Sequence, residues 1–125
     1  MPIISDWYDS GKSILVQRFE GQWSLEEYFR HLDQTVANHM PDRPLHIIAD
    51  FSASLTTPTR ILGGMRYFQR KIADYRGVSI FLNPSSTLED YFKLAHHIQD
   101  PASKDMYTAR DLPEAVEIIS THPNF

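Results

Sequence analysis

Short apolar runs and helical apolar stripes alternate along the first half of the chain. The runs predict strands at residues 3–9 and 13–21, with the turn-forming sequence DSGKS between them. Ser24 and Glu27 then form a capping-box pattern at the start of a helix, which MPDRP ends. Residues 45–51, LHIIADF, are apolar enough to predict a central strand that is covered on both faces.

A second helix is predicted at residues 58–76. Thr57 is placed to cap it, and Pro58 suits its first position, where no backbone N–H is needed. Apolar residues at helical spacing predict its buried side: Ile61, Leu62, Met65, Phe68, Ile72 and Tyr75.

The last part of the chain repeats the same alternation. VSIFL at 78–82 predicts a strand, and KDMYTA at 104–109 predicts another. A helix between them is expected to turn its apolar side inward as far as Ile98, and Asp111 is placed to cap a final helix. The order β-β-α-β-α-β-α-β-α predicts an α/β fold, with a mixed, mostly parallel five-stranded sheet flanked by four helices.

Composition narrows the class of protein. A chain of 125 residues is near the usual size of one domain, so we expect a single domain over residues 1–125. The sequence has no cysteine, which excludes disulfides, thiol catalysis and cysteine-ligated zinc, and it fits a cytoplasmic protein. A net charge of −4 argues against a general nucleic-acid binder. No leader or long apolar run is present, so we expect neither secretion nor membrane insertion.

Three stretches together resemble a known family. They are ILVQRFEGQWSLEEYFRHLDQ, LHIIADFSAS and MYTARDLPEAVEIIS, and they span nearly the whole chain. They resemble the STAS family of anti-sigma-factor antagonist domains, especially its SpoIIAA-like branch. The resemblance implies a non-enzymatic module that binds a protein partner, or a small or lipidic ligand, near the end of the central strand and the helix after it.

In regulatory members of that family, a serine in an Asp-Ser-Ser-Gly-like turn before this helix is phosphorylated. The matching region here reads LTTPTRILGG and lacks the serine pair. The hydroxyls that match it are those of Thr56, Thr57 and Thr59, and Thr57 is the candidate phosphoacceptor.

The hydroxyl-rich turn at 52–57 allows two interpretations. Ser52, Ser54, Thr56 and Thr57 are candidates to accept a phosphate or to bind an anion at the start of the helix, where free N–H groups favour negative charge. The same side chains are also those that hydrogen-bond turns and cap helices, and we favour this structural role. Asp50 is expected to end the strand in that role.

The second helix is basic, although the chain as a whole is acidic. Residues 57–77 contain five basic residues and one acidic residue, whereas the whole chain has a net charge of −4. Arg60, Arg66 and Arg70 are therefore candidates to bind an acidic protein partner or an anionic ligand. The alternative is a solvated helix face paired with neighbouring carboxylates.

Motifs for catalysis and metal binding are missing. The histidines have no metal-binding spacing, and the sequence has no nucleophile elbow, phosphate-cradling loop or cofactor fingerprint, so no metal or cofactor is expected. His46 and Asp50 fall on one face of the central strand, which leaves an acid–base enzyme as a minor alternative.

Aromatic side chains support either a packed core or a ligand cavity. The candidates are Trp7, Tyr8, Phe19, Trp23, Phe29, Phe68, Phe81, Tyr91 and Phe92. We favour the core, because protein interiors normally pack without large voids. The sequence thus favours a non-catalytic binding or regulatory module that works through the turn 52–57 and the helix 58–76. The alternative is a carrier of small apolar or lipid-like molecules between sheet and helices.

Overall fold

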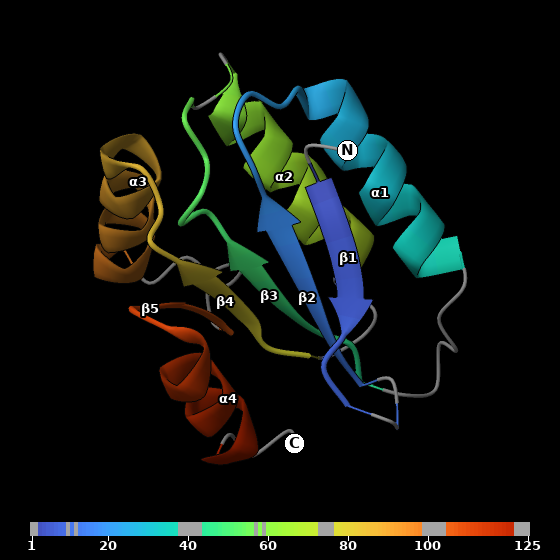
Figure 1. Ribbon diagram of the computed structural model, residues 1–125. Coiled ribbons are helices and arrows are strands. Elements are labelled where there is room, and N and C mark those ends of the chain that lie inside the picture. The colour runs from blue at the N-terminus through green and yellow to red at the C-terminus, as the bar shows by residue number, and fades with distance from the viewer. Residues whose placement is uncertain are drawn as a thin grey trace.

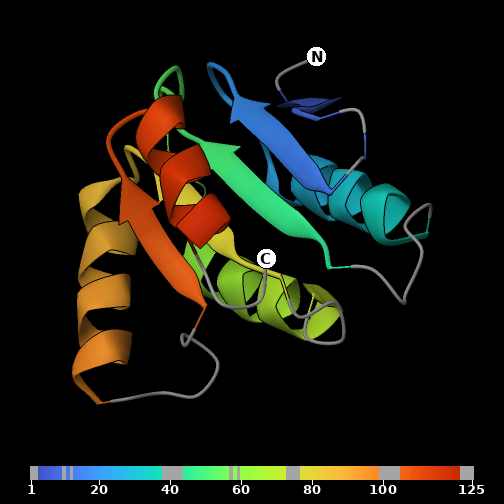
Figure 2. The same ribbon diagram turned by 90° about the horizontal axis from the view of Figure 1, so that it is seen from below.

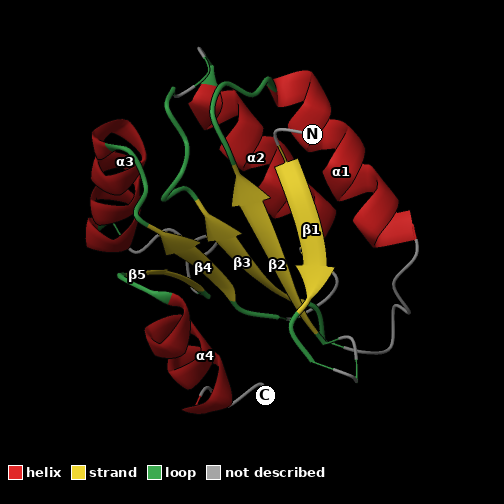
Figure 3. Ribbon diagram, viewed as in Figure 1, coloured by secondary structure: helices red, strands yellow, loops and turns green. Residues whose placement is uncertain are grey.

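Five strands form one mixed sheet in the order β1-β2-β3-β4-β5. In this computed structural model, the described residues are 3–9, 11, 13–37, 44–56, 58, 60–72, 77–98 and 105–121. The strands are β1 (Ile3–Trp7), β2 (Ile14–Phe19), β3 (His46–Asp50), β4 (Ser79–Leu82) and β5 (Met106–Ala109). The helices are α1 (Leu25–Ala37), α2 (Ile61–Ile72), α3 (Ser86–His97) and α4 (Leu112–Thr121) (Figure 3).

β1 and β2 are an antiparallel hairpin closed by one carboxylate. Tyr8 N donates to Ile14 O at 2.8 Å, and Asp9 Oδ1 accepts from the backbone N–H groups of Ser13 at 3.0 Å and Ile14 at 3.1 Å. Partial burial alone would raise the pKa of Asp9, but these hydrogen bonds and one from the Ser13 hydroxyl outweigh it, so the pKa lies below 3.8.

The strands from β2 to β5 are parallel, and the helices divide unequally between the two faces of the sheet. Helices α1, α2 and α3 cover one face and α4 alone covers the other (Figures 1 and 2). The fold class predicted from the sequence is confirmed, including the single antiparallel pair.

β3 contributes to two hydrophobic cores, as its apolar sequence predicts. Ile47 and Ala49 belong to the core beneath α1, α2 and α3, whereas Ile48 belongs to the core beneath α4. Side chains of successive residues point to opposite faces of a strand, so an uninterrupted apolar run fits a strand covered on both sides.

Two of the predicted helix caps are confirmed. Glu27 N donates to Ser24 Oγ at 3.2 Å at the start of α1, and Glu114 N donates to Asp111 Oδ1 at 3.0 Å at the start of α4. Each bond satisfies one of the N–H groups that a helix start leaves without an intrahelical partner.

The predicted start of α2 at Pro58 is wrong. Arg60 has a φ of 67°, which is outside the helical region, so the helix begins at Ile61. Arg60 O accepts the first helical hydrogen bond, from Gly64 N at 3.2 Å. The predicted cap, Thr57, lies outside the described residues, as do residues 73–76 at the predicted end.

Two apolar residues predicted to be buried are exposed. Leu62 is 47% exposed, because it lies about 100° around α2 from Ile61, at the border of the buried side. Ile98 is 63% exposed, because its backbone N–H still donates to Leu94 O at 3.0 Å and places it one turn after Leu94, on the exposed side of α3.

Two glycines provide a matched test of how closely the backbone at Gly77 packs against Leu45, just before β3. A Cβ at Gly77 would lie 1.7 Å from the Leu45 carbonyl oxygen, whereas a Cβ at Gly63 would meet no atom within 4 Å. We expect Gly77→Ala to lower the free energy of unfolding by more than about 3 kcal/mol, because the backbone before β3 must move. Gly63→Ala should raise it by up to about 1 kcal/mol through helix propensity. Urea unfolding of both variants measures the difference, and similar effects would contradict this packing.

Candidate functional site

The loops that follow the four parallel strands meet at one end of the sheet, because parallel strands direct their carboxyl ends to the same edge (Figure 1). The loop from β3 to α2 contains the hydroxyl-rich turn. Asp50 Oδ1 accepts from Ser52 N at 2.9 Å, and Ser54 N donates to Phe51 O at 3.0 Å. The predicted role of Asp50, ending the strand and bonding the turn, is confirmed.

Gly21, between β2 and α1, makes two backbone hydrogen bonds to the loop from β3 to α2. Gly21 N donates to Ala53 O at 2.9 Å, and Leu55 N donates to Gly21 O at 2.9 Å. Together they form an isolated parallel bridge between Gly21 and Ser54. The φ of Gly21 is 61°, a conformation that glycine adopts without steric cost. The pairing of β2 with β3 therefore continues beyond the ends of both strands.

The serine hydroxyls of the turn have structural partners. Ser52 Oγ accepts from Asn83 Nδ2 at 2.7 Å. Ser54 Oγ accepts from Trp23 Nε1 at 2.8 Å and donates to Thr56 O at 2.9 Å. Both serines thus have the structural role that the sequence favours for this turn.

Of the three candidate threonines, Thr56 alone lies among the described residues. Thr56 is exposed, and no partner is found for its hydroxyl among the described residues. Thr57 and Thr59 lie outside the described residues, so phosphorylation at Thr57 stays a prediction.

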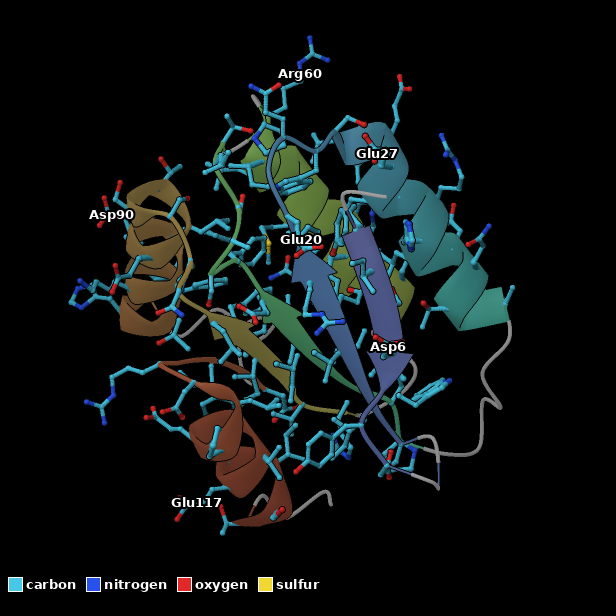
Figure 4. All side chains as sticks on the ribbon, in the orientation of Figure 1. Asp6, Glu20, Glu27, Arg60, Asp90 and Glu117 are labelled. Atoms are coloured by element: carbon cyan, nitrogen blue, oxygen red, sulfur yellow. The ribbon has the colours of Figure 1, made fainter. Side chains whose placement is uncertain are left out.

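Three predicted arginines lie on or beside the outer side of α2. Arg66 and Arg70 are exposed and one helical turn apart, and Arg60 is exposed at the start of the helix, where it points away from the sheet (Figure 4). None of the three forms an ion pair within the described part of the chain. The guanidinium groups therefore leave a positive surface available on this helix.

Lys71, by contrast, joins α2 to α1. Its Nζ lies 3.4 Å from Asp33 Oδ1, and Tyr67 donates its hydroxyl proton to the same oxygen at 2.6 Å. The hydrogen bond from Tyr67 is the main cause that lowers the pKa of Asp33 below 3.8. The same bond raises the pKa of Tyr67, and Asp33 raises that of Lys71. These residues fix the side of α2 that faces α1, whereas Arg66 and Arg70 remain exposed.

Leu55 is a candidate binding residue that the sequence analysis does not single out. Its side chain is 81% exposed, although its backbone N–H is fixed by Gly21. A leucine among hydroxyl residues was the available signal, since the turn itself needs no apolar side chain there. Leu62, on the neighbouring turn of α2, adds a second exposed apolar side chain.

The acid–base pair of His46 and Asp50 is contradicted by the structure. His46 is only 1% exposed, and its Nδ1 accepts a hydrogen bond from Val78 N at 2.9 Å. Four residues of strand, about 13 Å, separate it from Asp50, so the two side chains cannot share a proton. Within the described ranges, no cluster of three or more His, Cys, Asp or Glu side chains is arranged to hold a metal ion.

The aromatic side chains beneath α1, α2 and α3 pack against each other. Phe19 lies 4.7 Å from both Trp23 and Phe51 between ring centroids, and Phe81 lies 4.7 Å from Phe92. These residues form the core that the sequence reading favours over a ligand cavity. Trp7 and Tyr8 are exceptions, because they are 36% and 50% exposed at the hairpin.

Comparison with known proteins identifies the fold. Neither the protein-family models nor the curated proteins give a match. Among solved structures, the Bacillus cell-fate determinant SpoIIAA in its phosphorylated form matches with a TM-score of 0.66 and 18% identity, over 92% of this chain and 96% of that chain. The anti-sigma factor antagonist SpoIIAA in its unphosphorylated form matches with a TM-score of 0.68 and 15% identity, over 96% and 99%. This chain has a SpoIIAA-like STAS fold.

The STAS fold places the turn 52–56 and α2 at the end of the central strand, which is the region indicated by the sequence resemblance. None of the described helices is long and apolar enough to cross a bilayer.

The carboxylate of Asp33 gives a pH test of the contact between α1 and α2. Its pKa is lower in the folded protein than the usual 3.8, so its contribution to stability is present above that pH and is lost as the pH falls through the folded pKa. As the pH is lowered below 3.8, we expect the free energy of unfolding to fall less steeply with pH in Asp33→Asn than in the wild type.

Urea unfolding at several pH values measures these slopes, with the exposed Asp90→Asn as control. NMR titration of the Asp33 carboxyl should also show its pKa rising in Tyr67→Phe. A wild-type slope in Asp33→Asn, or an unchanged titration in Tyr67→Phe, would contradict this contact.

Proposed function

We propose that this chain is a non-catalytic regulatory module that binds a protein partner through residues 52–56 and the outer side of α2. The fold supports a binding role, because the solved protein that shares it, SpoIIAA, is an anti-sigma factor antagonist. The proposal needs no reactive group: the hydroxyls of Ser52 and Ser54 and the ring of His46 already serve the fold.

Leu55 carries the proposal. Its side chain is 81% exposed. The backbone on either side of it is fixed, because the N–H of Gly21 donates to Ala53 O and the C=O of Gly21 accepts from Leu55 N. An apolar side chain held in place before binding loses little conformational entropy when a partner covers it. Such an anchor is typical of the few residues that provide most of the binding energy at an interface.

The arginines indicate the chemistry of the partner. Arg60, Arg66 and Arg70 are exposed and have no carboxylate partner among the described residues. Guanidinium groups form strong paired hydrogen bonds with carboxylates, and a positive field speeds association with an acidic surface. The partner surface is therefore acidic, with an apolar pocket for Leu55.

The charge-reversed variant Arg60→Glu with Arg70→Glu tests this surface. We expect it to bind the partner at least about tenfold more weakly, because attraction becomes repulsion at both positions. Leu55→Ala should produce a similar loss, because it removes the apolar anchor. Both variants should have the same midpoint of urea unfolding as the wild type, since the altered side chains are exposed.

The readout is quantitative capture from a lysate of the source organism, followed by titration of the captured protein. Arg30→Glu with Lys93→Glu is the matched control: it changes the charge equally, but at exposed positions on α1 and α3. Equal capture by the wild type and the α2 variant, or equal loss in the control, would overturn the proposal.

A further inference from the structure

A groove lies at the opposite edge of the sheet from β1. Helices α3 and α4 leave neighbouring strands toward opposite faces of the sheet, so their first turns diverge (Figure 2). A crevice of about 570 Å³ lies between them, lined by Asn83, Pro84, Glu89, Thr108, Ala109, Arg110 and Glu114. A smaller cavity of about 200 Å³ is lined by Glu89, Phe92, Lys93, Tyr107 and Thr108. Because the two share Glu89 and Thr108, they form one continuous groove along β5.

The backbone of β5 faces this groove at Thr108. β5 is an edge strand, paired only with β4. Ser79 N donates to Asp105 O at 2.9 Å and Asn83 N donates to Ala109 O at 3.4 Å, so alternate residues of β5 bond to β4. The N–H and C=O of Thr108 therefore point to the open edge. Among the described residues, no hydrogen-bond partner is found for them.

The groove also offers an unpaired carboxylate and an apolar wall. Glu89, in the first turn of α3, has no ion-pair partner among the described residues. Glu114 pairs with Arg110 at 3.3 Å, but the Arg110 side chain is 90% exposed, so this pair is weak. Phe92, from the core beneath α3, and Tyr107, on β5, are among the residues that line the smaller cavity.

We propose that this groove binds an extended peptide segment as an added strand on β5, with a basic side chain of the peptide facing Glu89. Main-chain hydrogen bonds to Thr108 supply attachment that does not depend on sequence, and the pockets on either side supply specificity. Successive side chains of an extended peptide point in opposite directions, one toward α3 and the next toward α4. This site is independent of the α2 surface proposed above.

Asn83 holds the edge in place before binding. Its φ is 50°, and its Nδ2 donates to Ser52 Oγ at 2.7 Å and to Arg110 O at 3.3 Å. One side chain thus joins the three loops that follow β3, β4 and β5. The loop after β5 is fixed by this bond, so an added strand meets a rigid edge.

The test is a titration of the ¹⁵N-labelled full chain with the peptide acetyl-Thr-Val-Lys-Val-Thr-amide, followed by NMR. We expect saturable shifts in β5 and the first turn of α3, and slower hydrogen exchange at the Thr108 amide. The same peptide with Glu in place of Lys should bind at least tenfold more weakly. Absence of saturable shifts, shifts confined to α2, or equal binding of the two peptides would overturn the proposal.

A charge swap tests the role of Glu89. Glu89→Lys should weaken binding of the Lys peptide at least tenfold and make the Glu peptide the tighter ligand. Asp90→Lys is the matched control, because it is the next residue of α3 and points away from the groove (Figure 4), so its affinity should stay within twofold of wild type. An unchanged preference in Glu89→Lys would overturn the assignment of the basic side chain to Glu89.

Thr108→Pro tests the main-chain contact. It removes the outward N–H but leaves the bonds to β4, and proline is tolerated on an edge strand in that position. We expect at least a tenfold loss of peptide binding with an unchanged melting temperature. If the variant fails to fold, a peptide N-methylated at its lysine and at both flanking residues makes the same test from the ligand side, whichever direction the added strand runs. Full binding by the folded proline variant or by the methylated peptide would overturn strand addition.

Discussion

The parallel pairing of β2 with β3 continues past the ends of both strands, and the arrangement of the loop from β3 to α2 depends on this continuation. Gly21 donates to Ala53 and accepts from Leu55, both at 2.9 Å, with a φ of 61°. A residue with a Cβ would be strained in that conformation. Without this bridge, the segment after β3 would have no main-chain partner on its β2 side, and Leu55 would lose its fixed position.

The core supports the same loop from beneath. Phe51, the first residue after β3, stacks on Phe19 with ring centroids 4.7 Å apart, and its backbone N–H donates to Leu82 O at 3.0 Å. Trp23 packs against Phe19 and donates its indole N–H to Ser54. A loop with apolar anchors at its base and hydrogen bonds along its length can keep a leucine exposed without collapsing onto the core.

The sequence predicted the elements and the structural role of the turn, because both depend on local chemistry. An uninterrupted apolar run located β3, apolar periodicity located the helices, and Ser24 and Asp111 cap the helices that they were expected to cap. The start of α2 was misplaced, because a threonine and a proline suggested an earlier start than the backbone of Arg60 allows.

Contacts between distant parts of the chain were beyond a reading of one sequence. Asn83 bonds to Ser52 and Arg110 across 31 and 27 residues, and the exposure of Leu55 follows from its pairing with Gly21. The edge groove needs the divergence of α3 and α4 to exist. Local pattern therefore predicted the scaffold, whereas the surfaces that it presents depend on tertiary contacts.

The unequal division of helices between the two faces has a consequence for how the molecule opens. Among the described helices, α4 alone shields Ile14, Ile48 and Ile80, and its buried residues are Ala115 and Ile119. Release of this one helix would expose a broad aliphatic surface while the three-helix face stays packed. An aliphatic surface exposed in this way favours aggregation, so the packing of α4 protects the chain against it.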